Sequence, residues 1–266
     1  MKLVGQSISF VKANACGNDF LLIDGSLAPR DISAFTQQIC NRHQGIGADG
    51  VEWIFPHSST DAEARLINAD GSPAEISGNG TRCVAALICS ERGKEKVTIQ
   101  TGAGVKSCQL ICRRESEFEF EMEMGRSDVG KEFTVRISNG EVRGIPVSMG
   151  NPHYVTFVDH FKNDWQCEAA EIQRSDEFKL GVNVELVITE GKNDIAVRFF
   201  ERGVGETQSS GTGSCAAAVA AITAGRCQSP VKVHAPGGIQ TVRFERGLVF
   251  LRGTARIVSR GEYFLS

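Results

Sequence analysis

The chain of 266 residues carries an internal repeat with one constant spacing of 133 residues, the separation between Ser77 and Ser210. The segments that this spacing relates are Arg65-Leu66-Ile67-Asn68 and Arg198-Phe199-Phe200-Glu201, Ser77-Gly78-Asn79-Gly80 and Ser210-Gly211-Thr212-Gly213, Gly17-Asn18 and Gly150-Asn151, and Val51-Glu52 and Val184-Glu185. A spacing shared at four places, with no insertion between them, is hard to reach by chance. The repeat predicts two halves of similar structure, with matched chemical groups in each.

The length of the chain fits this division, because halves of about 130 residues are near the usual size of a domain. We place the halves at residues 1–125 and 126–266, with the boundary in the polar stretch 125–131. Two like halves that face each other would present like groups to opposite sides of one ligand. This arrangement suits a reaction that removes a proton from one face of a carbon and returns a proton to the other face.

The composition limits the partners of the protein. Hydrophobic residues make up 41% of the chain and charged residues 23%, which is ordinary for a soluble protein. The net charge is −3 without a basic stripe, so nucleic acid is not an expected partner. No apolar stretch approaches the ~20 residues of a membrane span, and the first residues become polar too early for a signal peptide. We therefore expect a cytoplasmic protein with no membrane partner.

Nine cysteines at irregular positions are expected to be free thiols, because their number is odd and no secretion signal precedes them. Cys108 and Cys112 have the spacing of half a zinc site. However, they lie in an alternating, strand-like run, and no second pair has the spacing of metal ligands. We therefore expect no metal.

The sequence predicts few helices and many strands. Helices are expected at residues 32–42, 80–92 and 212–224, and strands at 97–100, 117–122, 231–234 and 248–251. The second and third helices are apolar on nearly all sides, which is typical of buried helices, and Gly93 and Gly225 end them. The first three strands alternate as half-buried strands do, whereas the fourth is continuously apolar, as in a fully buried strand. These elements predict an α/β fold of the α+β type: two pseudo-symmetric halves, each a mostly antiparallel sheet wrapped around a central helix.

Two matched glycine loops, Ser77-Gly78-Asn79-Gly80 and Ser210-Gly211-Thr212-Gly213, open the two buried helices. The first N–H groups of a helix have no partner within it, and the helix dipole adds partial positive charge there. Such a terminus binds a carboxylate or phosphate without a cationic side chain. Alternatively, each loop is only a serine N-cap with a tight turn. Because two such loops occur at matched positions of the repeat, we favour binding of an anionic ligand, and we expect both helices to point at one shared cleft. Neither loop has the Gly-Lys-Ser/Thr ending of nucleotide sites, so a nucleotide ligand is not expected.

Further polar residues cluster beside these loops. Single Asn-Gly or Asn-Pro pairs are usually turns, and Arg202 could equally be a solvated side chain. Taken together, however, they form a set of amides with one Arg and one Glu, which suits a zwitterionic ligand. The residues of this set are Asn18, Asn68, Asn151, Asn183, Glu201 and Arg202.

The chain resembles the diaminopimelate epimerase family over nearly its whole length. The blocks that carry the resemblance are KANACGNDF at 12–20, RHQGIGADGV at 42–51, NADGS at 68–72, GNGTRC at 78–83, MGNPH at 149–153, NVE at 183–185 and ERGVGET at 201–207. The resemblance implies an enzyme that uses no cofactor and interconverts L,L- and meso-diaminopimelate, a small amino acid on the route to lysine and cell-wall peptide. It also implies two α/β halves that close on the substrate, and a homodimer.

The resemblance also assigns residues. Two cysteines of the family, each directly before its glycine loop, act as base and acid, and these positions fall on Ser77 and Ser210. Cys83 and Cys215 lie further on, within the predicted buried helices, and cannot replace them without a register shift. By the same match His153 and Glu201 flank the reacting amino group. The residues implied to hold the distal end of the substrate are Asn18, Asn68, Asn151, Asn183 and Arg202.

Serine at both thiol positions leaves three interpretations. A thiol with a pKa of about 8.5 ionises in part near neutral pH, whereas a serine needs an adjacent base, and the sequence shows none. The chain is then an epimerase with low or no activity, with both thiols changed to serine. It could instead be a divergent isomerase with His153 or Glu201 as base, or an amino-acid-binding protein without catalysis. The intact set of binding residues favours the first interpretation.

Overall fold

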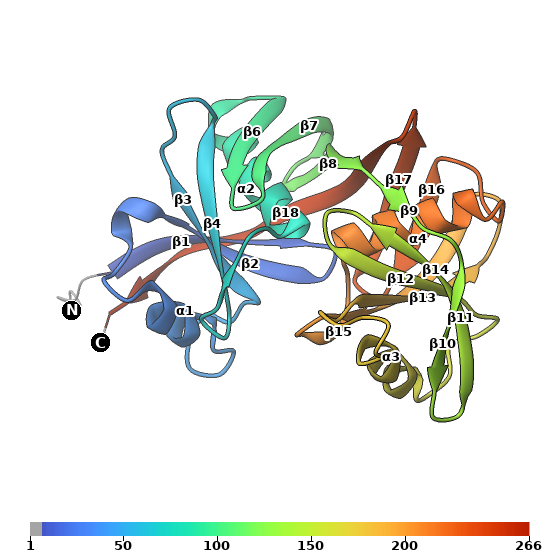
Figure 1. Cartoon of the computed structure of the whole chain (residues 1–266). Helices are drawn as coiled ribbons and strands as arrows, with labels where there is room; N and C mark the ends of the chain where they lie inside the picture. The colour runs from blue at the N-terminus through green and yellow to red at the C-terminus, as the bar shows by residue number, and fades with distance from the viewer. Residues whose placement is uncertain (1–6, 266) are drawn as a thin grey trace. The chain divides into compact units, whose positions relative to one another are not determined.

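The computed structural model describes residues 7–265, which form two compact units (Figure 1). Unit 1 comprises the described residues up to Met122 together with those from Gly253 onward, and unit 2 comprises Glu123–Arg252. The division differs from the two consecutive halves that the repeat indicates. The last residues of the chain, from Gly253, pack with unit 1 rather than with the second half.

Unit 1 is built on strands around one central helix. Its elements are β1 (Ser7–Ala15), β2 (Asn18–Asp24), η1 (Gly25–Leu27), α1 (Ile32–Cys40), β3 (Gly50–Phe55), β4 (Ala62–Asn68), β5 (Pro73–Ala74), α2 (Gly78–Arg92), β6 (Lys96–Thr101), β7 (Gly104–Arg114), most of β8 (Glu117–Arg126) and the end of β18 (Leu248–Phe264). β1 pairs antiparallel with β2 and with β18, and β6, β7 and β8 follow one another antiparallel. Within the described residues of this unit, only the pairs β2–β3 and β4–β6 are parallel.

Unit 2 repeats this plan. Its elements are β9 (Asp128–Val129), β10 (Phe133–Ile137), β11 (Gly140–Ser148), β12 (Pro152–Phe157), α3 (Trp165–Gln173), β13 (Asn183–Thr189), β14 (Asp194–Glu201), β15 (Gly205–Thr207), α4 (Gly211–Thr223), β16 (Val231–Ala235), β17 (Gly238–Glu245) and the start of β18. β12–β13 and β14–β16 are parallel, and the other pairs are antiparallel.

The repeat extends to the register of the strands. β2 pairs with β3 as β12 pairs with β13, and β3 pairs with β4 as β13 pairs with β14. The residue pairs related by the spacing of 133 are Phe20–Gly50 and His153–Asn183, Leu22–Glu52 and Val155–Glu185, and Glu52–Leu66 and Glu185–Phe199. The residue at each of these positions therefore has a structural counterpart in the other unit.

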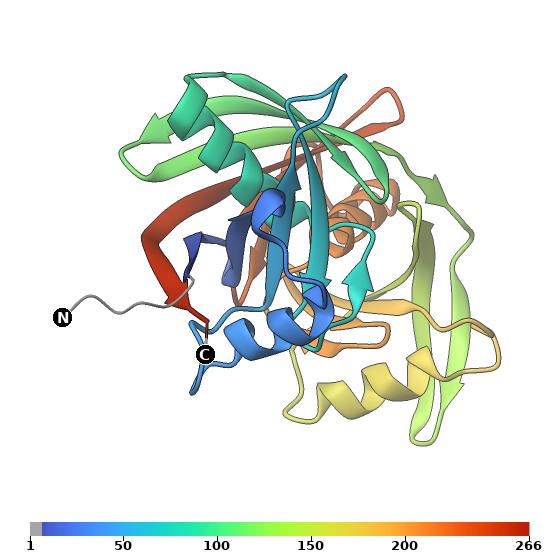
Figure 2. The same ribbon diagram turned by 90° about the vertical axis from the view of Figure 1, so that its left-hand side faces the viewer.

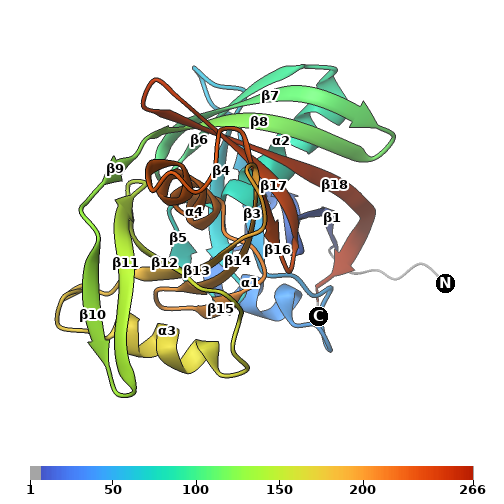
Figure 3. The ribbon, with the colours of Figure 1, turned by 90° about the vertical axis from the view of Figure 1, so that its right-hand side faces the viewer.

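Each unit encloses its central helix, as the sequence predicts. α2 packs against β1, β2 and β6 (Figure 2), and α4 packs against β11, β12 and β13 (Figure 3). Almost all residues of the first three turns are buried in both helices. Gly93, at the C-cap of α2, has a φ of 67°, a conformation that glycine adopts without strain. The mixed α+β fold with central helices is confirmed.

Two details differ from the sequence prediction. α3 was not expected, although Trp165, Ala169 and Ile172 follow helical spacing and form its buried face. The predicted strand at 248–251 is only the start of the 17-residue β18, and its burial alternates. The prediction of a fully buried strand was wrong because Phe250 lies outside the core, where the Arg243 guanidinium covers its ring at 4.0 Å.

Within the described residues, no helix is both long and apolar enough to cross a membrane.

Candidate functional site

Ser77 and Ser210 are the N-caps of the two central helices. The Gly80 N–H donates to Ser77 Oγ at 3.1 Å, and the Gly213 N–H donates to Ser210 Oγ at 3.2 Å. Both serines have extended backbones, as N-cap residues do. An N-cap serine accepts a hydrogen bond, so its own hydroxyl proton stays available for another acceptor. Capping and a chemical role are therefore compatible at these positions.

An amide lies against the first turn of each helix at matched positions. The Asn79 Nδ2 group donates to Asn18 Oδ1 at 3.4 Å in unit 1, and Asn151 Nδ2 donates to Thr212 Oγ1 at 3.4 Å in unit 2. These contacts connect the start of β2 in unit 1, and the residue before β12 in unit 2, to the glycine loop of the same unit. Each unit therefore brings its predicted loop residues together with one predicted amide.

Charged groups hold the unit 1 amides in place. Asn18 Nδ2 donates to Asp49 Oδ2 at 2.5 Å, and Asp49 also accepts from Arg42 at 2.8 Å. Asn79 Oδ1 accepts from Arg82, which is fully buried. Asn68, at the end of β4, donates instead to Ser72 Oγ at 3.0 Å.

A buried carboxyl that the sequence analysis did not select lies beneath the unit 1 loop. Glu52 on β3 is 3% exposed, and burial raises the pKa of its carboxyl to about 8. A Cβ atom at Gly80 would lie only 2.1 Å from Glu52 Oε1, so only glycine fits there. The repeat contained a signal for this group, because Glu52 and Glu185 are acidic residues at matched positions within apolar strands.

In unit 2 the matching carboxyl has a partner. Glu185 Oε1 lies 2.7 Å from His153 Nδ1, and both side chains are fully buried. His153 Nε2 lies 3.0 Å from Asn151 Oδ1, so the imidazole is held at both nitrogens. Burial raises the pKa of Glu185, and the neighbouring His153 opposes that shift. A carboxylate that fixes the orientation of a histidine is an arrangement that supports proton transfer.

Ser210 has a neighbouring carboxyl in Glu201. Burial raises the pKa of Glu201, while hydrogen bonds from Thr207 and Ser210 and the charge of His153 act in the opposite direction. The Thr207 hydroxyl donates to Glu201 Oε1 at 2.6 Å. Sequence reasoning found no base beside either serine. In unit 2 the structure places a carboxyl beside Ser210, because β14 ends at Glu201 and β15 returns the chain to the start of α4.

Asn183 and Arg202 lie beside His153 and Glu201. Asn183 Nδ2 donates to the Pro152 carbonyl at 3.0 Å, and Asn183 Oδ1 accepts from the Arg202 N–H at 2.9 Å. The Arg202 side chain is exposed and donates to the Leu180 carbonyl at 3.0 Å. Asn183 therefore joins the ends of β12, β13 and β14, in addition to any contact with a ligand.

We expect Asn183→Ala to destabilise the protein by about 1–3 kcal/mol, because it removes the side-chain partner of the Pro152 carbonyl and of the Arg202 N–H group. Urea denaturation monitored by circular dichroism measures this loss. Asn163→Ala, at an exposed position before α3, is the matched control and should change the free energy of unfolding little. Equal stability of the two variants would contradict the joining role of Asn183.

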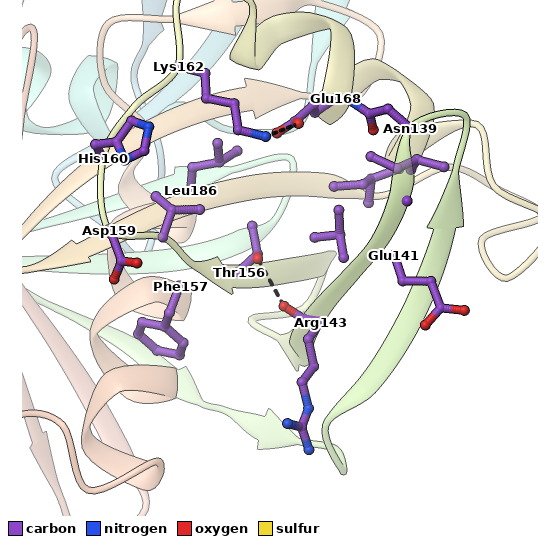
Figure 4. Close-up of a pocket in the computed structure, with 15 residues that line it drawn as sticks. Asn139, Glu141, Arg143, Thr156, Phe157, Asp159, His160, Lys162, Glu168 and Leu186 are labelled. Carbon is purple, nitrogen blue, oxygen red and sulfur yellow. Dashed lines mark hydrogen bonds and ion pairs between the residues drawn. The ribbon is translucent and has the colours of Figure 1, made fainter.

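A hollow of about 390 Å³ in unit 2 lies apart from these residues, between β10, β11, β12 and α3 (Figure 4). Lys162 pairs with Glu168 at its rim, and the Thr156 hydroxyl donates to the Arg143 carbonyl at 2.9 Å in its wall. None of the residues predicted for the functional site lines this hollow.

Comparison with known proteins identifies the family of the chain. The family model described as diaminopimelate epimerase matches residues 10–130 and 145–258. A diaminopimelate epimerase of Halothermothrix orenii is 34% identical over 279 residues, which cover 96% of this chain and 97% of that protein. The chain belongs to the diaminopimelate epimerase family. A second member, from Caldanaerobacter subterraneus, is 35% identical over 271 residues, which cover 95% of this chain and 98% of that protein.

Solved structures share the fold at low sequence identity. A PhzF-family phenazine biosynthesis protein of Bacillus anthracis superposes with a TM-score of 0.75 at 17% identity, over 98% of this chain and 100% of that one. A hydroxyproline epimerase from Agrobacterium vitis, with bound trans-4-hydroxy-L-proline, has a TM-score of 0.69 at 16% identity, over 98% and 92% of the two chains. These structural similarities support the fold described above for this chain.

The nine cysteines are all free thiols, as the sequence predicts. Cys83 and Cys215 are fully buried in α2 and α4, and burial raises the pKa of Cys83 far above its ordinary value. Neither thiol replaces a serine at the start of a helix. Among the described residues, 7–265, no group of three or more His, Cys, Asp or Glu side chains is arranged to hold a metal ion.

Proposed function

We propose that the protein is an amino-acid epimerase that interconverts L,L- and meso-diaminopimelate by proton transfer without a cofactor. The observation that carries this proposal is the 34–35% identity to enzymes of that name over 95–96% of the chain. We also propose that it acts in the cytoplasm as a homodimer, which is the state implied by the family resemblance.

Binding of the substrate follows from the polar residues. Asn18, Asn68, Asn151, Asn183 and Arg202 are proposed to hold the distal amino-acid end. The N–H groups that open α2 and α4, at Gly78-Asn79 and Gly211-Thr212, are proposed to bind the carboxylate beside the reacting carbon. Removal of the α-proton shifts negative charge onto that carboxylate. Helix N-termini stabilise such charge, which lowers the barrier to the reaction.

Ser77 and Ser210 are proposed to occupy the two proton-transfer positions, with His153 and Glu201 beside the reacting amino group. We expect a rate below that of an enzyme with two thiols, because a hydroxyl ionises far less readily than a thiol. The hydrogen bond between Ser210 and Glu201 supports a residual activity. A serine beside a carboxylate can pass its proton on, as serine nucleophiles do with an adjacent base.

A second candidate is an isomerase of the same fold in which His153 or Glu201 is itself the base. The buried pair of His153 and Glu185 favours this alternative, because the carboxyl group holds the imidazole in one orientation. The two candidates differ in their dependence on the serines. A variant with Ser77→Ala and Ser210→Ala loses α-proton transfer in the first candidate and keeps it in the second.

Exchange of the α-proton of diaminopimelate in deuterium oxide tests the proposed function. Incorporation of deuterium with interconversion of the two stereoisomers, resolved by chiral chromatography, is the expected result. Binding of diaminopimelate without exchange would instead identify an amino-acid-binding protein. Exchange with another amino acid but not with diaminopimelate would overturn the proposed substrate.

We expect Arg202→Ala to weaken the binding of diaminopimelate by about 1.5–3 kcal/mol, the usual range for a hydrogen bond to a charged group. Isothermal titration calorimetry measures this change, with lysine as the comparison ligand because it lacks the distal carboxylate. Arg174→Ala, which removes an exposed arginine of the same unit, is the control. Equal affinity of the unmodified protein for diaminopimelate and lysine would contradict the role of Arg202.

A further inference from the structure

Glu52 and Ser77 border the same space in unit 1. A Cβ atom at Gly80 would lie 2.1 Å from Glu52 Oε1 and 3.3 Å from Ser77 Cβ, so the absent side chain of Gly80 leaves these two groups on one side of the helix start. Ser77 Oγ already accepts the Gly80 N–H, and no described residue accepts the Ser77 hydroxyl proton. The hydroxyl is therefore available to a neighbouring carboxyl or to a substrate.

The carboxyl of Glu52 is buried without a compensating charge. Its neighbours across the strands are the apolar Leu22 on β2 and Leu66 on β4. On the α2 side, Cys83 is the titratable group whose pKa the charge of Glu52 raises. The residues on either side of Glu52, Val51 and Trp53, point to the opposite face of β3, where they pack in the core with α1.

No ion pair or hydrogen bond to the Glu52 side chain is found within residues 7–265, and burial alone accounts for its raised pKa. A carboxyl in such surroundings keeps its proton near neutral pH. It can therefore donate a hydrogen bond or a proton, which an ionised carboxylate cannot do.

The matched position in unit 2 shows what is different about Glu52. Glu185 has His153 as its partner, whereas Phe20 stands at the position in unit 1 that corresponds to His153. In unit 2 the imidazole opposes the rise in the pKa of Glu185 that burial causes, and in unit 1 an apolar ring stands at the position of the imidazole. The same fold thus carries a carboxyl in contact with an imidazole in one unit and a carboxyl without such a partner in the other.

We propose that Glu52 exchanges a proton with Ser77, so that the pair takes the place of a single acid or base in unit 1. This inference rests on the proposed function. In the donating direction, Ser77 gives its hydroxyl proton to the α-carbanion and a new C–H bond forms. The Glu52 O–H bond breaks as its proton moves to the Ser77 oxygen, which leaves neutral serine and an ionised Glu52. In the reverse direction each of these steps is reversed, and no other reactant is consumed.

Glu52→Gln tests this role, because the amide keeps the shape of the side chain but exchanges no proton. We expect epimerisation of diaminopimelate to fall at least about 100-fold, within the usual range for loss of a general acid or base. One stereoisomer presents its α-proton to Ser210 of unit 2. For this stereoisomer, exchange of the α-proton with deuterium oxide should persist, with retention of configuration at the α-carbon. Glu52→Asp should recover part of the lost epimerisation.

Testing Glu52→Gln in a second protein that carries Ser77→Cys distinguishes proton exchange by Glu52 from a structural role of Glu52. With cysteine at position 77, introduced as Ser77→Cys, the same Glu52→Gln change should lower the rate less than about tenfold, because a thiol ionises without a partner. A structural role of Glu52 predicts equal losses in both backgrounds. Equal losses, or an unchanged rate in the serine background, would overturn the proposal.

Infrared spectroscopy of the free protein gives a readout that does not depend on turnover. The component of the carbonyl absorption of protonated carboxyls that belongs to Glu52 should disappear as the pH rises through about 8. This component should be missing from Glu52→Gln and should shift in Ser77→Ala. A band that Ser77→Ala leaves unchanged would overturn the pairing alone. Absence of α-proton exchange in the unmodified protein with every amino acid would overturn the proposed function and, with it, this role.

Discussion

Replacing Ser77 and Ser210 together by cysteine is expected to raise the rate of diaminopimelate epimerisation by about 10²–10⁴-fold, the usual contribution of general acid–base catalysis. Both serines are N-caps whose Oγ atoms accept a glycine N–H. A thiol at a helix N-terminus has a lowered pKa, so a usable fraction is thiolate near neutral pH. The rate of the double variant should fall at low pH as this thiolate is protonated. Chiral chromatography of the products at a series of pH values measures both effects.

The single variants provide the controls for this experiment. Ser77→Cys or Ser210→Cys alone supplies one of the two groups that inversion needs, so each should increase α-proton exchange more than it increases epimerisation. If the unmodified protein already turns over at an ordinary enzymatic rate, and the double variant is no faster, the serines do not occupy the thiol roles. Proton transfer would then be assigned to His153 and Glu201.

Glu52→Gln is expected to stabilise the folded protein at alkaline pH. The carboxyl has an ordinary pKa of 4.5 in the unfolded chain and keeps its proton up to about 8 in the folded protein. The favourable contribution of the neutral acid is therefore complete below pH 4.5, and it is lost as the pH rises through 8. A shift of this size corresponds to a loss on the order of 4–5 kcal/mol at full ionisation. The amide variant does not incur this loss.

Urea denaturation at pH 5, 7 and 9 measures this difference. The free energy of unfolding of Glu52→Gln should exceed that of the unmodified protein at pH 9, and the difference should shrink or change sign at pH 5. Glu95→Gln, at an exposed position between α2 and β6, is the control and should follow the unmodified protein. Parallel curves for Glu52→Gln and the unmodified protein would show that Glu52 is ionised at its ordinary pKa in the folded state.

The sequence predicted the central helices because their signals are local. A serine followed by a glycine-rich turn, an apolar stretch of three turns and a final glycine each act within a few residues of the chain. α3 was missed although its buried face follows the same spacing. Its N-terminal Asp164 makes no capping hydrogen bond, so the usual start signal has no counterpart in the structure.

The surroundings of the serines were less predictable, because they depend on contacts between distant segments. Glu52 lies beneath Gly80 only because β3 runs parallel to β2 and α2 crosses the same face. Ser210 lies beside Glu201 because β15 pairs with β14 before the helix begins. Neither contact follows from the spacing of residues along the chain. The repeat did contain one usable signal, the matched acidic residues at 52 and 185. Their surroundings differ because the adjacent strand carries His153 in unit 2 and Phe20 in unit 1.

The long strand β18 also determines the order in which the chain can fold during synthesis. Its first residues pair with β17 in unit 2, and its last residues pair with β1, from Asn14–Arg256 to Ser7–Phe264. Unit 2 is one continuous stretch and has all its residues once the chain reaches Arg252. The edge of β1 stays without this partner until residues 256–264 leave the ribosome. The unit that is translated first is therefore the last to be completed, and its exposed strand edge must be protected from other chains throughout translation.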